Sequence, residues 1–300
     1  MNIIVTGAAG QLGADVMAEL NKRNIEHTGI DKMAQPSPYH TLDITDSEAV
    51  NAFFAEHKPR CVVHCAAYTA VDKAEDEAEL CYKVNAEGTE ILAKACKESG
   101  AEMIYISTDY VFDGKGETPY ETDAVKGAIS TYGKSKLAGE EAVLRHLANY
   151  YIVRISWVFG KNGNNFVKTM LRLAAQNVTG EPSPCHMSPC LNVVGDQVGS
   201  PTYTADLAVL LCDMVLSGKY GTYHATNEGY CSWADFASEI MKQSGTQCKI
   251  NPITTEQYPT KAARPKNSRL SKISLDKAGF NRLPPWQDAL HRFLQEVNEK

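Results

Sequence analysis

Residues 1–13 read Met1-Asn-Ile-Ile-Val-Thr-Gly7-Ala-Ala-Gly10-Gln-Leu-Gly13, an apolar run followed by three evenly spaced glycines. The run Ile3–Thr6 predicts a buried strand, and the stretch from about Gln11 to Arg23 predicts a helix. Glycines at such a junction allow a tight turn, close approach of the backbone to a pyrophosphate, and close helix–strand packing. The free N–H groups of the helix then attract phosphates. This stretch predicts a dinucleotide site, with cofactor contacts at Gly7, Gly10, Gln11, Leu12 and Gly13.

Short β-branched runs alternate with helical stretches through the first half of the chain. Further strands are expected at Ile25–Asp31, Cys61–Cys65, Met103–Ser107 and Tyr151–Ile155. Helices are expected at Leu80–Ser99 and Thr131–Ala148, and after the capping-box pattern Thr45-Asp-Ser-Glu48. This alternation predicts an α/β fold of the Rossmann type, a doubly wound parallel sheet with helices on both faces.

The second half of the chain is less regular. We expect an exposed loop at 180–189, an irregular stretch at Tyr258–Asn267, and helices at Thr204–Leu216, Trp233–Ser244 and Trp286–Asn298. Thr204 and Ser232 are the expected N-caps of the first two helices. The sequence thus predicts a dinucleotide-binding domain with the catalytic residues at 1–160 and a smaller C-terminal substrate-binding lobe at 161–300, some segments of which return to the sheet.

The composition narrows the class of protein. With 43% hydrophobic and 22% charged residues the chain is ordinary for a soluble protein, and a net charge of −6 argues against nucleic-acid binding. We find no apolar run long enough for a membrane, no room for a targeting segment, and nine cysteines without a disulfide pattern. These features predict a cytoplasmic protein. The cluster Cys185, His186 and Cys190 lacks a zinc spacing and is interpreted as part of a loop insertion.

Two acidic positions bear on the type of cofactor. Asp31 ends the second predicted strand, where a carboxylate accepts hydrogen bonds from the adenosine ribose, although such an acid also serves as a simple turn cap. Asp31 favours NADH, whereas the adjacent Lys32 favours the 2′-phosphate of NADPH, so both cofactors are expected. Further cofactor contacts are expected at Asp43, Ile44, Ala66, Ala67 and Tyr68.

The candidate chemistry lies at one strand end and one helix start. Tyr132 and Lys136 are four residues apart and therefore share a helix face, where an ammonium lowers the pKa of a phenol and also holds the nicotinamide ribose. Alone, this pair is more often a solvated surface. Thr108, at the end of another strand, is placed to donate a hydrogen bond to a carbonyl oxygen. Together the three predict carbonyl reduction. Asn85 is interpreted either as a support of this site or as a simple polar helix residue.

Longer strings occur in order along the chain: Gly10-Gln-Leu-Gly13, Ala66-Ala-Tyr-Thr-Ala-Val-Asp-Lys-Ala-Glu75, Ser107-Thr-Asp-Tyr-Val-Phe-Asp-Gly114, Tyr132-Gly-Lys-Ser-Lys-Leu-Ala-Gly-Glu140, Ser156-Trp-Val-Phe-Gly160, Gly195-Asp-Gln-Val-Gly-Ser-Pro-Thr-Tyr203 and Arg264-Pro-Lys-Asn-Ser-Arg-Leu270. Over nearly its whole length the chain resembles the dTDP-4-dehydrorhamnose reductases of the extended short-chain dehydrogenase/reductase family. The resemblance implies NAD(P)H-dependent reduction of the 4-keto group of dTDP-4-dehydro-L-rhamnose. It implies catalytic roles for Thr108, Tyr132 and Lys136, and substrate contacts from Thr108, Asp109, Tyr110, Trp157, Arg264 and Asn267.

The chain departs from the family pattern at Gln176–Pro189, which is longer and richer in cysteine, and at Gly127-Ala-Ile129, which replaces Pro-Leu. Some family members dimerise around magnesium held by carboxylates. Asp15 and Asp206 stand at roughly matching positions, so a homodimer and magnesium stay open and no metal is predicted.

Three other functions share motifs with this chain. Sugar-nucleotide 4,6-dehydratases need Asp and Glu after the threonine, whereas here the pair is Asp109-Tyr110. Epimerases fit the Ser107–Phe112 string poorly. The rival of a different class is a non-catalytic NADP-binding regulatory subunit, similar to that of methionine adenosyltransferase. Trp157 and the Arg264–Ser268 string favour the reductase.

Overall fold

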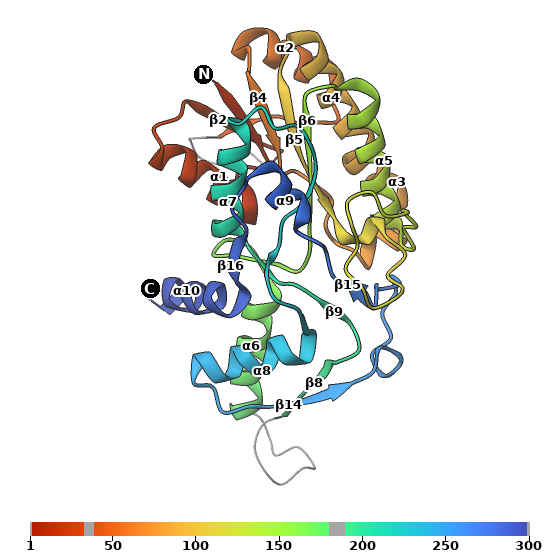
Figure 1. Cartoon of the computed structure of the whole chain (residues 1–300), viewed down its shortest axis with the longest axis vertical. Coiled ribbons are helices and arrows are strands. Elements are labelled where there is room, and N and C mark those ends of the chain that lie inside the picture. The colour runs from red at the N-terminus through yellow and green to blue at the C-terminus, as the bar shows by residue number, and fades with distance from the viewer. Residues whose placement is uncertain (1, 33–38, 180–189, 299–300) are drawn as a thin grey trace.

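The computed structural model describes residues 2–32, 39–179 and 190–298. A parallel sheet flanked by helices forms the upper part of the molecule, and a smaller lobe lies below the carboxyl ends of its strands (Figure 1). None of the described helices is long and apolar enough to cross a membrane.

The main sheet has seven strands in the order β11-β6-β5-β4-β1-β2-β3, and every neighbouring pair is parallel. The strands are β1 (Ile3–Thr6), β2 (His27–Asp31), β3 (His40–Thr41), β4 (Cys61–His64), β5 (Glu102–Thr108), β6 (Tyr150–Ile155) and β11 (Gly221–His224). The chain runs from β1 outward to β3 and then returns through β4 toward β11. Ligands bind at such a reversal of strand order. The predicted doubly wound fold is confirmed.

Helices cover both faces of the sheet (Figure 1). One face carries α1 (Gln11–Lys22) and α7 (Thr204–Val215), which pack against each other; the other carries α2 (Ser47–His57), α4 (Gly88–Ser99) and α5 (Thr131–His146). In α1 the buried side chains Leu12, Val16, Met17 and Leu20 recur at helical spacing, which forms the apolar stripe that faces the sheet. Since α7 and β11 come from the second half of the chain, that half contributes to the core of the sheet.

Two predicted helix starts are wrong and one is confirmed. Asp46, not Thr45, caps α2 and accepts the N–H of Ala49 at 3.0 Å, while the Thr45 hydroxyl donates to Asp43. The N-cap of α7 is Tyr203, because Thr204 is already helical and its hydroxyl reaches back to the Phe159 carbonyl. At α8 (Trp233–Ser244), Ser232 caps the helix in a capping box with Asp235.

The helix expected at Leu80–Ser99 consists of three joined parts. They are α3 (Ala78–Tyr82), the π-helical turn η2 (Lys83–Glu87) and α4. The wide turn contains Asn85, whose side-chain amide bonds both the N–H and the C=O of Tyr68. A π-turn inside a helix often marks a functional site, and this one brings Asn85 to the loop after β4.

The lower lobe has a core of its own, rich in aromatic side chains. It is built from α6 (Phe166–Thr179), which the sequence analysis did not predict, α8, and α10 (Trp286–Asn298), whose position was predicted. Short strand pairs complete it: β7 (Val158–Phe159) with β10 (Thr202–Tyr203), β8 (Cys190–Val194) with β14 (Lys249–Ile253), β9 (Val198–Gly199) with β13 (Cys231–Ser232) and β15 (Asn267–Ser268), and β12 (Asn227–Glu228) with β16 (Leu283–Pro285). The helix α9 (Ile273–Ala278) packs near β11. Cys185 and His186 lie outside the described residues.

Candidate active site

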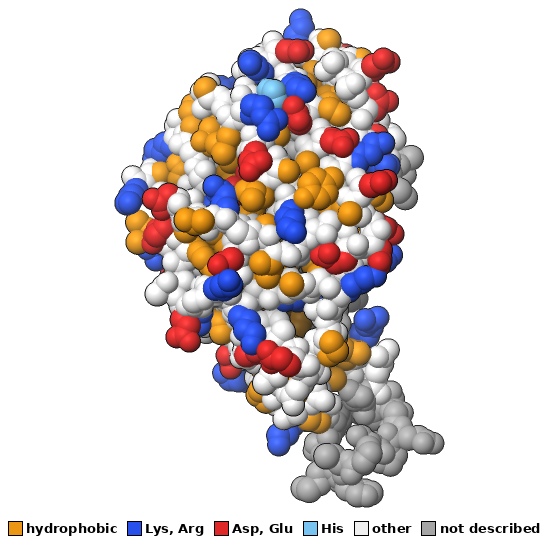
Figure 2. Space-filling model, turned by 90° about the vertical axis from the view of Figure 1, so that its right-hand side faces the viewer, with side chains coloured by type: hydrophobic (Ala, Val, Ile, Leu, Met, Phe, Trp, Pro, Cys, Tyr) orange, Lys and Arg blue, Asp and Glu red, His pale blue; other side chains and the backbone are white. Residues whose placement is uncertain are grey.

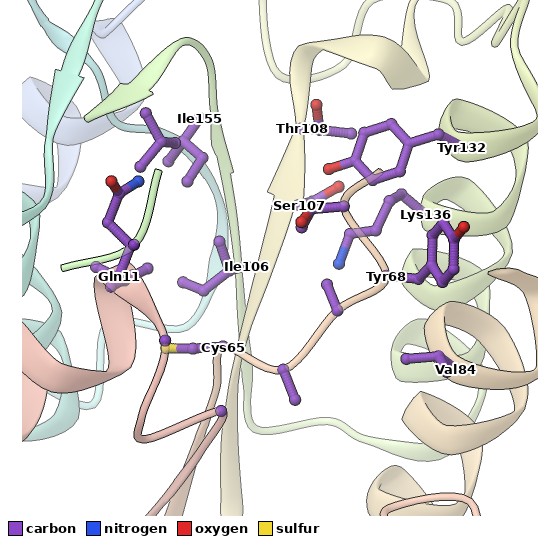
Figure 3. Close-up of a pocket in the computed structure, with 18 of the residues that line it drawn as sticks. Gln11, Cys65, Tyr68, Val84, Ile106, Ser107, Thr108, Tyr132, Lys136 and Ile155 are labelled. Carbon is purple, nitrogen blue, oxygen red and sulfur yellow. The ribbon is translucent and has the colours of Figure 1, made fainter. Parts of the chain in front are cut away.

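A cavity of about 840 Å³ opens at the carboxyl ends of the central strands, between the sheet and the lower lobe (Figure 3). Most residues that the sequence assigned to a site line it: Gly7, Gly10, Gln11, Leu12, Asp31, Asp43, Ile44, Ala66, Ala67, Tyr68, Thr108, Asp109, Tyr110, Tyr132, Lys136 and Trp157. Gly13, Arg264 and Asn267 do not line this cavity. The fold therefore joins the predicted dinucleotide turn and the predicted catalytic residues in one space.

The turn between β1 and α1 requires its glycines. Gly7 has a φ of +64°, and a Cβ on it would lie 2.8 Å from the backbone nitrogen of Ala66. A Cβ on Gly13 would lie 2.1 Å from the carbonyl oxygen of Gly7, so Gly13 acts by letting the helix pack on the turn. The bare backbone at this end of the cavity fits a dinucleotide phosphate.

Asp31 and Asp43 stand beside this turn. Asp31 accepts the N–H of Ala9 at 3.1 Å, which ties β2 to the glycine turn. The ammonium of Lys32 lies 2.9 Å from the carboxylate of Asp43. Burial opposes ionisation of Asp43, but the hydrogen bonds from Thr45 and Lys32 outweigh it and lower its pKa. Lys32 thus already has an anionic partner, which a 2′-phosphate would have to share.

Asn85 connects the loop after β4 to the catalytic helix. Its amide donates to the Tyr68 carbonyl at 3.1 Å and to the Ser135 hydroxyl at 3.0 Å, and its oxygen accepts the Tyr68 N–H at 2.8 Å. Ser135 in turn donates to the Tyr132 carbonyl at 2.7 Å. Of the two interpretations of Asn85, the geometry supports that of a residue holding the backbone beside the site.

Tyr132 and Lys136 point from the first turns of α5 into the cavity, toward the end of β5 (Figure 3). The expected lowering of the Tyr132 pKa is not what the structure gives. Burial, aided by the Asp109 carboxylate, raises the pKa of Tyr132 and outweighs a hydrogen bond with Thr108. The reason is that desolvation of a buried phenolate exceeds the favourable contacts. A phenol that keeps its proton is suited to donate it.

Lys136 is buried, with 3% of its surface exposed, and its ammonium lies 4.1 Å from the centre of the Tyr105 ring. Burial lowers the pKa of Lys136 to about 7, although Glu140 acts in the opposite direction. The face of the Tyr105 ring contacts the ammonium, and the negative charge of Glu140, one turn further along α5, favours its protonated form. A new negative charge in the cavity would favour its protonated form.

Asp109 and Tyr110 follow Thr108 in the short helix η3 (Asp109–Val111). The Asp109 carboxylate accepts hydrogen bonds from Ser268 at 2.5 Å and from Thr108 at 3.0 Å. Burial raises the pKa of Asp109 to about 6. The Tyr110 ring meets Tyr132 edge to face, with 5.5 Å between the ring centres. Both residues therefore adjoin the predicted acid–base group.

Trp157 forms the wall of the cavity on the side of the lower lobe. It has a φ of +51°, which is unusual for a bulky residue and marks a constrained position. Its indole stacks on Trp233 with 3.8 Å between the ring centres. A Cβ on Gly199 would come within 2.9 Å of the same indole. Trp233 and Gly199 of the lower lobe thus hold the indole of Trp157 in place.

Arg264 lies at a second cavity, of about 630 Å³, which Lys115, Lys266 and Arg269 also line. It donates to the Tyr110 hydroxyl at 3.1 Å, and Tyr110 lines the first cavity, so the two cavities are neighbours. Asn267 lines neither cavity. It is 1% exposed, and its amide donates to the carbonyls of Lys115 and Thr118. Asn267 thus supports the loop around Lys115, which lines the second cavity, without lining the cavity itself.

Several side chains that line the first cavity were not among the residues predicted from the sequence. Ile106 and Ser107 at the end of β5, Ile155 and Ser156 at the end of β6, and Cys65 after β4 all line it. The sequence could have predicted these residues, because each stands at or directly after the carboxyl end of a predicted strand and such ends meet at one edge of a parallel sheet. Leu80 and Val84 line it as well, from the segment around η2 that was expected to be a regular helix.

Within the described part of this single chain, Asp206 already has cationic and amide partners, and burial affects the Asp15 carboxylate. Asp206 accepts two hydrogen bonds from Arg292, at 2.6 and 2.8 Å, and one from Asn227. Burial raises the pKa of Asp15, which opposes a charged ligand. Within residues 2–32, 39–179 and 190–298, no group of three or more His, Cys, Asp or Glu side chains is arranged to hold an ion.

Comparison with known proteins places the chain among nucleotide-sugar enzymes. The family model described as the RmlD substrate binding domain matches residues 1–299. The spore coat polysaccharide biosynthesis protein SpsK of Bacillus subtilis is 40% identical over 98% of this chain and 97% of its own. The dTDP-4-dehydrorhamnose reductase of Streptomyces griseus is 40% identical over 96% of this chain and 91% of its own.

A solved dTDP-4-dehydrorhamnose reductase from Bacillus anthracis, in complex with NADP, superposes with a TM-score of 0.90 at 41% identity, covering 98% of this chain and 99% of that one. A UDP-glucose 4-epimerase from Thermus thermophilus, complexed with NAD, shares the fold at a TM-score of 0.82, but only 21% of its residues are identical over 99% of each chain.

Proposed function

Because the chain belongs to the RmlD substrate binding domain family, we infer that it is an NAD(P)H-dependent oxidoreductase that reduces the 4-keto group of dTDP-4-dehydro-L-rhamnose to give dTDP-L-rhamnose. The observation that carries this function is the joining of two half-sites in one cavity. A bare glycine turn lies at one end, and the hydroxyls of Thr108 and Tyr132 lie with Lys136 at the other.

The residues present fit a nicotinamide cofactor, which supplies a hydride when bound. The tight turn at Gly7 lets the backbone approach its phosphates, and the first N–H groups of α1, which begins at Gln11, have no partner within the helix and are available to them. Asp31 and Asp43 stand near the end of β2, where the adenosine would lie. The loop Ala66–Tyr68, held by Thr6 and Asn85, forms the wall beside Lys136.

In the proposed mechanism Tyr132 holds the proton that the reaction needs. Its raised pKa keeps the phenol protonated until negative charge develops on the O4 atom of the sugar, and the proton then passes to that oxygen. The Thr108 hydroxyl, which donates to Asp109 in the structure, turns to donate its hydrogen bond to the same oxygen when the sugar is bound. The Lys136 ammonium stabilises the phenolate that remains. Trp157, Asp109 and Tyr110 shape the sugar pocket around these groups.

We place the nucleotide end of the substrate toward the second cavity. Arg264 stands between Tyr110 of the first cavity and the cations of the second, where a guanidinium can bind a diphosphate in a bidentate manner. Asn267, initially expected to contact this end directly, supports the loop around Lys115 instead.

Turnover separates this function from a non-catalytic NADP-binding regulatory subunit. Purified protein mixed with NADPH and dTDP-4-dehydro-L-rhamnose should consume the cofactor and yield dTDP-L-rhamnose. Cofactor binding without consumption would identify the regulatory module. A dehydratase is disfavoured by Tyr110, which stands where that class needs its second acid and whose hydroxyl is bonded to Arg264. An epimerase is disfavoured by its poor fit to the string Ser107–Phe112.

Arg264→Ala should raise the KM for the nucleotide sugar and leave the Kd for NADPH unchanged, because Arg264 lies at the second cavity and not at the dinucleotide turn. Steady-state kinetics and fluorescence titration of the cofactor measure the two constants. Lys219→Ala, a change in the turn before β11 remote from both cavities, is the control. An unchanged KM in Arg264→Ala contradicts the assignment.

We extend the proposal to the organisation of the protein. Residues 1–160 bind the cofactor and carry the catalytic groups, and residues 161–300 supply most of the substrate lobe. We place the enzyme in the cytoplasm, since the eight described cysteines are all free thiols. We propose a homodimer through the side of α5, on which Leu144 is 45% exposed and before which Ile129 is 40% exposed. Apolar side chains are scattered over this side of the molecule (Figure 2). Light scattering of the purified protein tests the dimer.

A further inference from the structure

A short acidic segment between β4 and α3 is not used by the mechanism above. It spans residues 72–77, includes the 3₁₀ turn η1 (Lys73–Glu75), and carries the carboxylates of Asp72, Glu75, Asp76 and Glu77. Part of it belongs to one of the strings that relate the chain to its family, but none of its residues was assigned a role. We call it the 72–77 segment.

The four carboxylates of the 72–77 segment have partners in three parts of the site: the loop after β4, the stretch 261–264 and the start of α5. Glu77 accepts the hydroxyl of Tyr68 at 2.6 Å, in the loop that lines the cofactor end. Asp76 pairs with Lys261. Asp72 bonds the stretch of the lower lobe that carries Arg264, and Glu75 bonds the start of the catalytic helix α5. These two carboxylates therefore reach residues to which a function is assigned above.

Glu75 bonds the first residue of the catalytic helix. Its carboxylate oxygens accept the N–H and the hydroxyl of Thr131, both at 2.9 Å. The first N–H groups of a helix have no partner within it, and an anion near this end is also favoured by the helix dipole. Ser130 satisfies the N–H of Gly133. The two contacts together fix the backbone on either side of Tyr132.

Asp72 bonds the arm of the lower lobe that carries Arg264. One carboxylate oxygen lies 2.6 Å from the guanidinium of Arg264, and the other accepts the N–H of Ala262 at 3.1 Å. The other terminal nitrogen of the same guanidinium donates to the Tyr110 hydroxyl. Asp72 therefore fixes both the backbone and the side-chain direction of a residue far away in the sequence.

The segment between these two carboxylates is itself ordered by backbone hydrogen bonds. Ala74 donates to Ala70 at 2.9 Å, and Glu77 donates to Lys73 at 2.8 Å. Asp72 and Glu75 are thus held on one short turn. This one turn therefore positions Tyr132 at the sugar end of the proposed substrate and Arg264 at its nucleotide end.

We propose that Glu75 is a positioning residue for the proton donor Tyr132, and that Asp72 is a positioning residue for the diphosphate contact Arg264. The proposal rests on the function inferred above. Neither residue lines either cavity. Each acts through the residue that it holds, so the two should affect different kinetic constants although they are three residues apart.

The test compares Glu75→Ala, Glu75→Gln and Asp72→Asn with Glu79→Ala, an exposed acid on the neighbouring helix α3. In Glu75→Ala we expect kcat to fall at least tenfold, about 1.4 kcal/mol, with the KM for the sugar and the Kd for NADPH within twofold. Glu75→Gln keeps one acceptor for Thr131 and should recover most of the rate. Asp72→Asn should raise the KM for the sugar at least fivefold with kcat within twofold. Glu79→Ala should match the wild type.

Amide hydrogen exchange of the NADPH-bound protein gives a readout that needs no turnover. Glu75→Ala should speed exchange in the peptide covering residues 130–134, and Asp72→Asn should speed it at residues 260–264, without reciprocal effects. An inactive wild type would refute the proposed function, and the exchange pattern would still judge the two contacts. The positioning roles are refuted if kcat in Glu75→Ala stays within threefold of an active wild type. They also fail if exchange is unchanged, or if both variants alter the same constant.

Discussion

The buried ion pair between Arg154 of β6 and Glu140 of α5 offers a test of how the sheet holds the catalytic helix. The side chains are 2% and 0% exposed, and two guanidinium nitrogens lie 2.7 and 2.8 Å from the two carboxylate oxygens. Arg154 also donates to the Thr122 carbonyl, and Ser107, the neighbour of Thr108, donates to Glu140 at 2.6 Å. The pair thus joins β5, β6 and α5 directly below the catalytic residues.

Arg154→Met keeps most of the volume and removes the charge. Within the described part of the chain, the buried Glu140 carboxylate then keeps a single hydrogen-bond donor, the Ser107 hydroxyl. Breaking a buried pair in this way costs about 3–5 kcal/mol in the free energy of unfolding. The matched surface change is Lys94→Ala. Lys94 pairs with Glu90 at 2.9 Å, but the two side chains are 55% and 32% exposed, so its loss should cost at most about 0.5 kcal/mol.

Urea unfolding at neutral pH without ligands, followed by tryptophan fluorescence and circular dichroism, measures both changes. The double variant Arg154→Met/Glu140→Leu should regain much of the lost stability, because the buried carboxylate that lost its guanidinium partner is removed as well. A loss below about 1 kcal/mol in Arg154→Met, the range of surface pairs, would refute the reasoning. So would a double variant as unstable as the sum of the two single changes.

Three further predictions concern the chemistry. Tyr132→Phe should lower kcat by about 10²–10⁴-fold at saturating substrates, because only the proton-donating hydroxyl is lost; a kcat within about threefold of the wild type would exclude Tyr132 as the acid. NADH and NADPH should both be oxidised, with values of kcat/KM within about 100-fold, or 2.7 kcal/mol, because Lys32 is shared with Asp43; a larger ratio in steady-state assays contradicts this. The folded pKa of Lys136 is about 7, below the ordinary value of a lysine, so the unfolded chain binds more protons between these two values. The stability of the wild type relative to Lys136→Met should therefore rise from pH 7 to pH 10, by up to about 1.4 kcal/mol per pH unit, and denaturation curves showing no such rise would place Lys136 in a solvated environment.

The sequence predicted what depends on local spacing. Gly7, Gly10, Thr108, Tyr132 and Lys136 reach one cavity because strand ends and helix starts meet at one edge of a parallel sheet. Both the fold class and the family followed from such short strings.

Contacts between distant segments could not be predicted in the same way. The bonds of Glu75 to Thr131 and of Asp72 to Arg264 join residues 56 and 192 positions apart. Likewise, the raised pKa of Tyr132 depends on desolvation, which the sequence does not display. Asn267 illustrates the same limit, because its family string was visible but its burial was not.

The order of the strands has a consequence for synthesis on the ribosome. The edge strand β11 ends at His224, and α7, which covers α1, comes from Thr204–Val215. Apolar side chains of α1 and of the central strands therefore have no cover until more than two thirds of the chain has been translated. The dinucleotide-binding half cannot bury these apolar side chains until α7 and β11 have been synthesised. A fragment ending at residue 160 would expose them to solvent and should aggregate. The proposed boundary at residue 160 therefore separates two functions, whereas the two parts of the chain fold together as one unit.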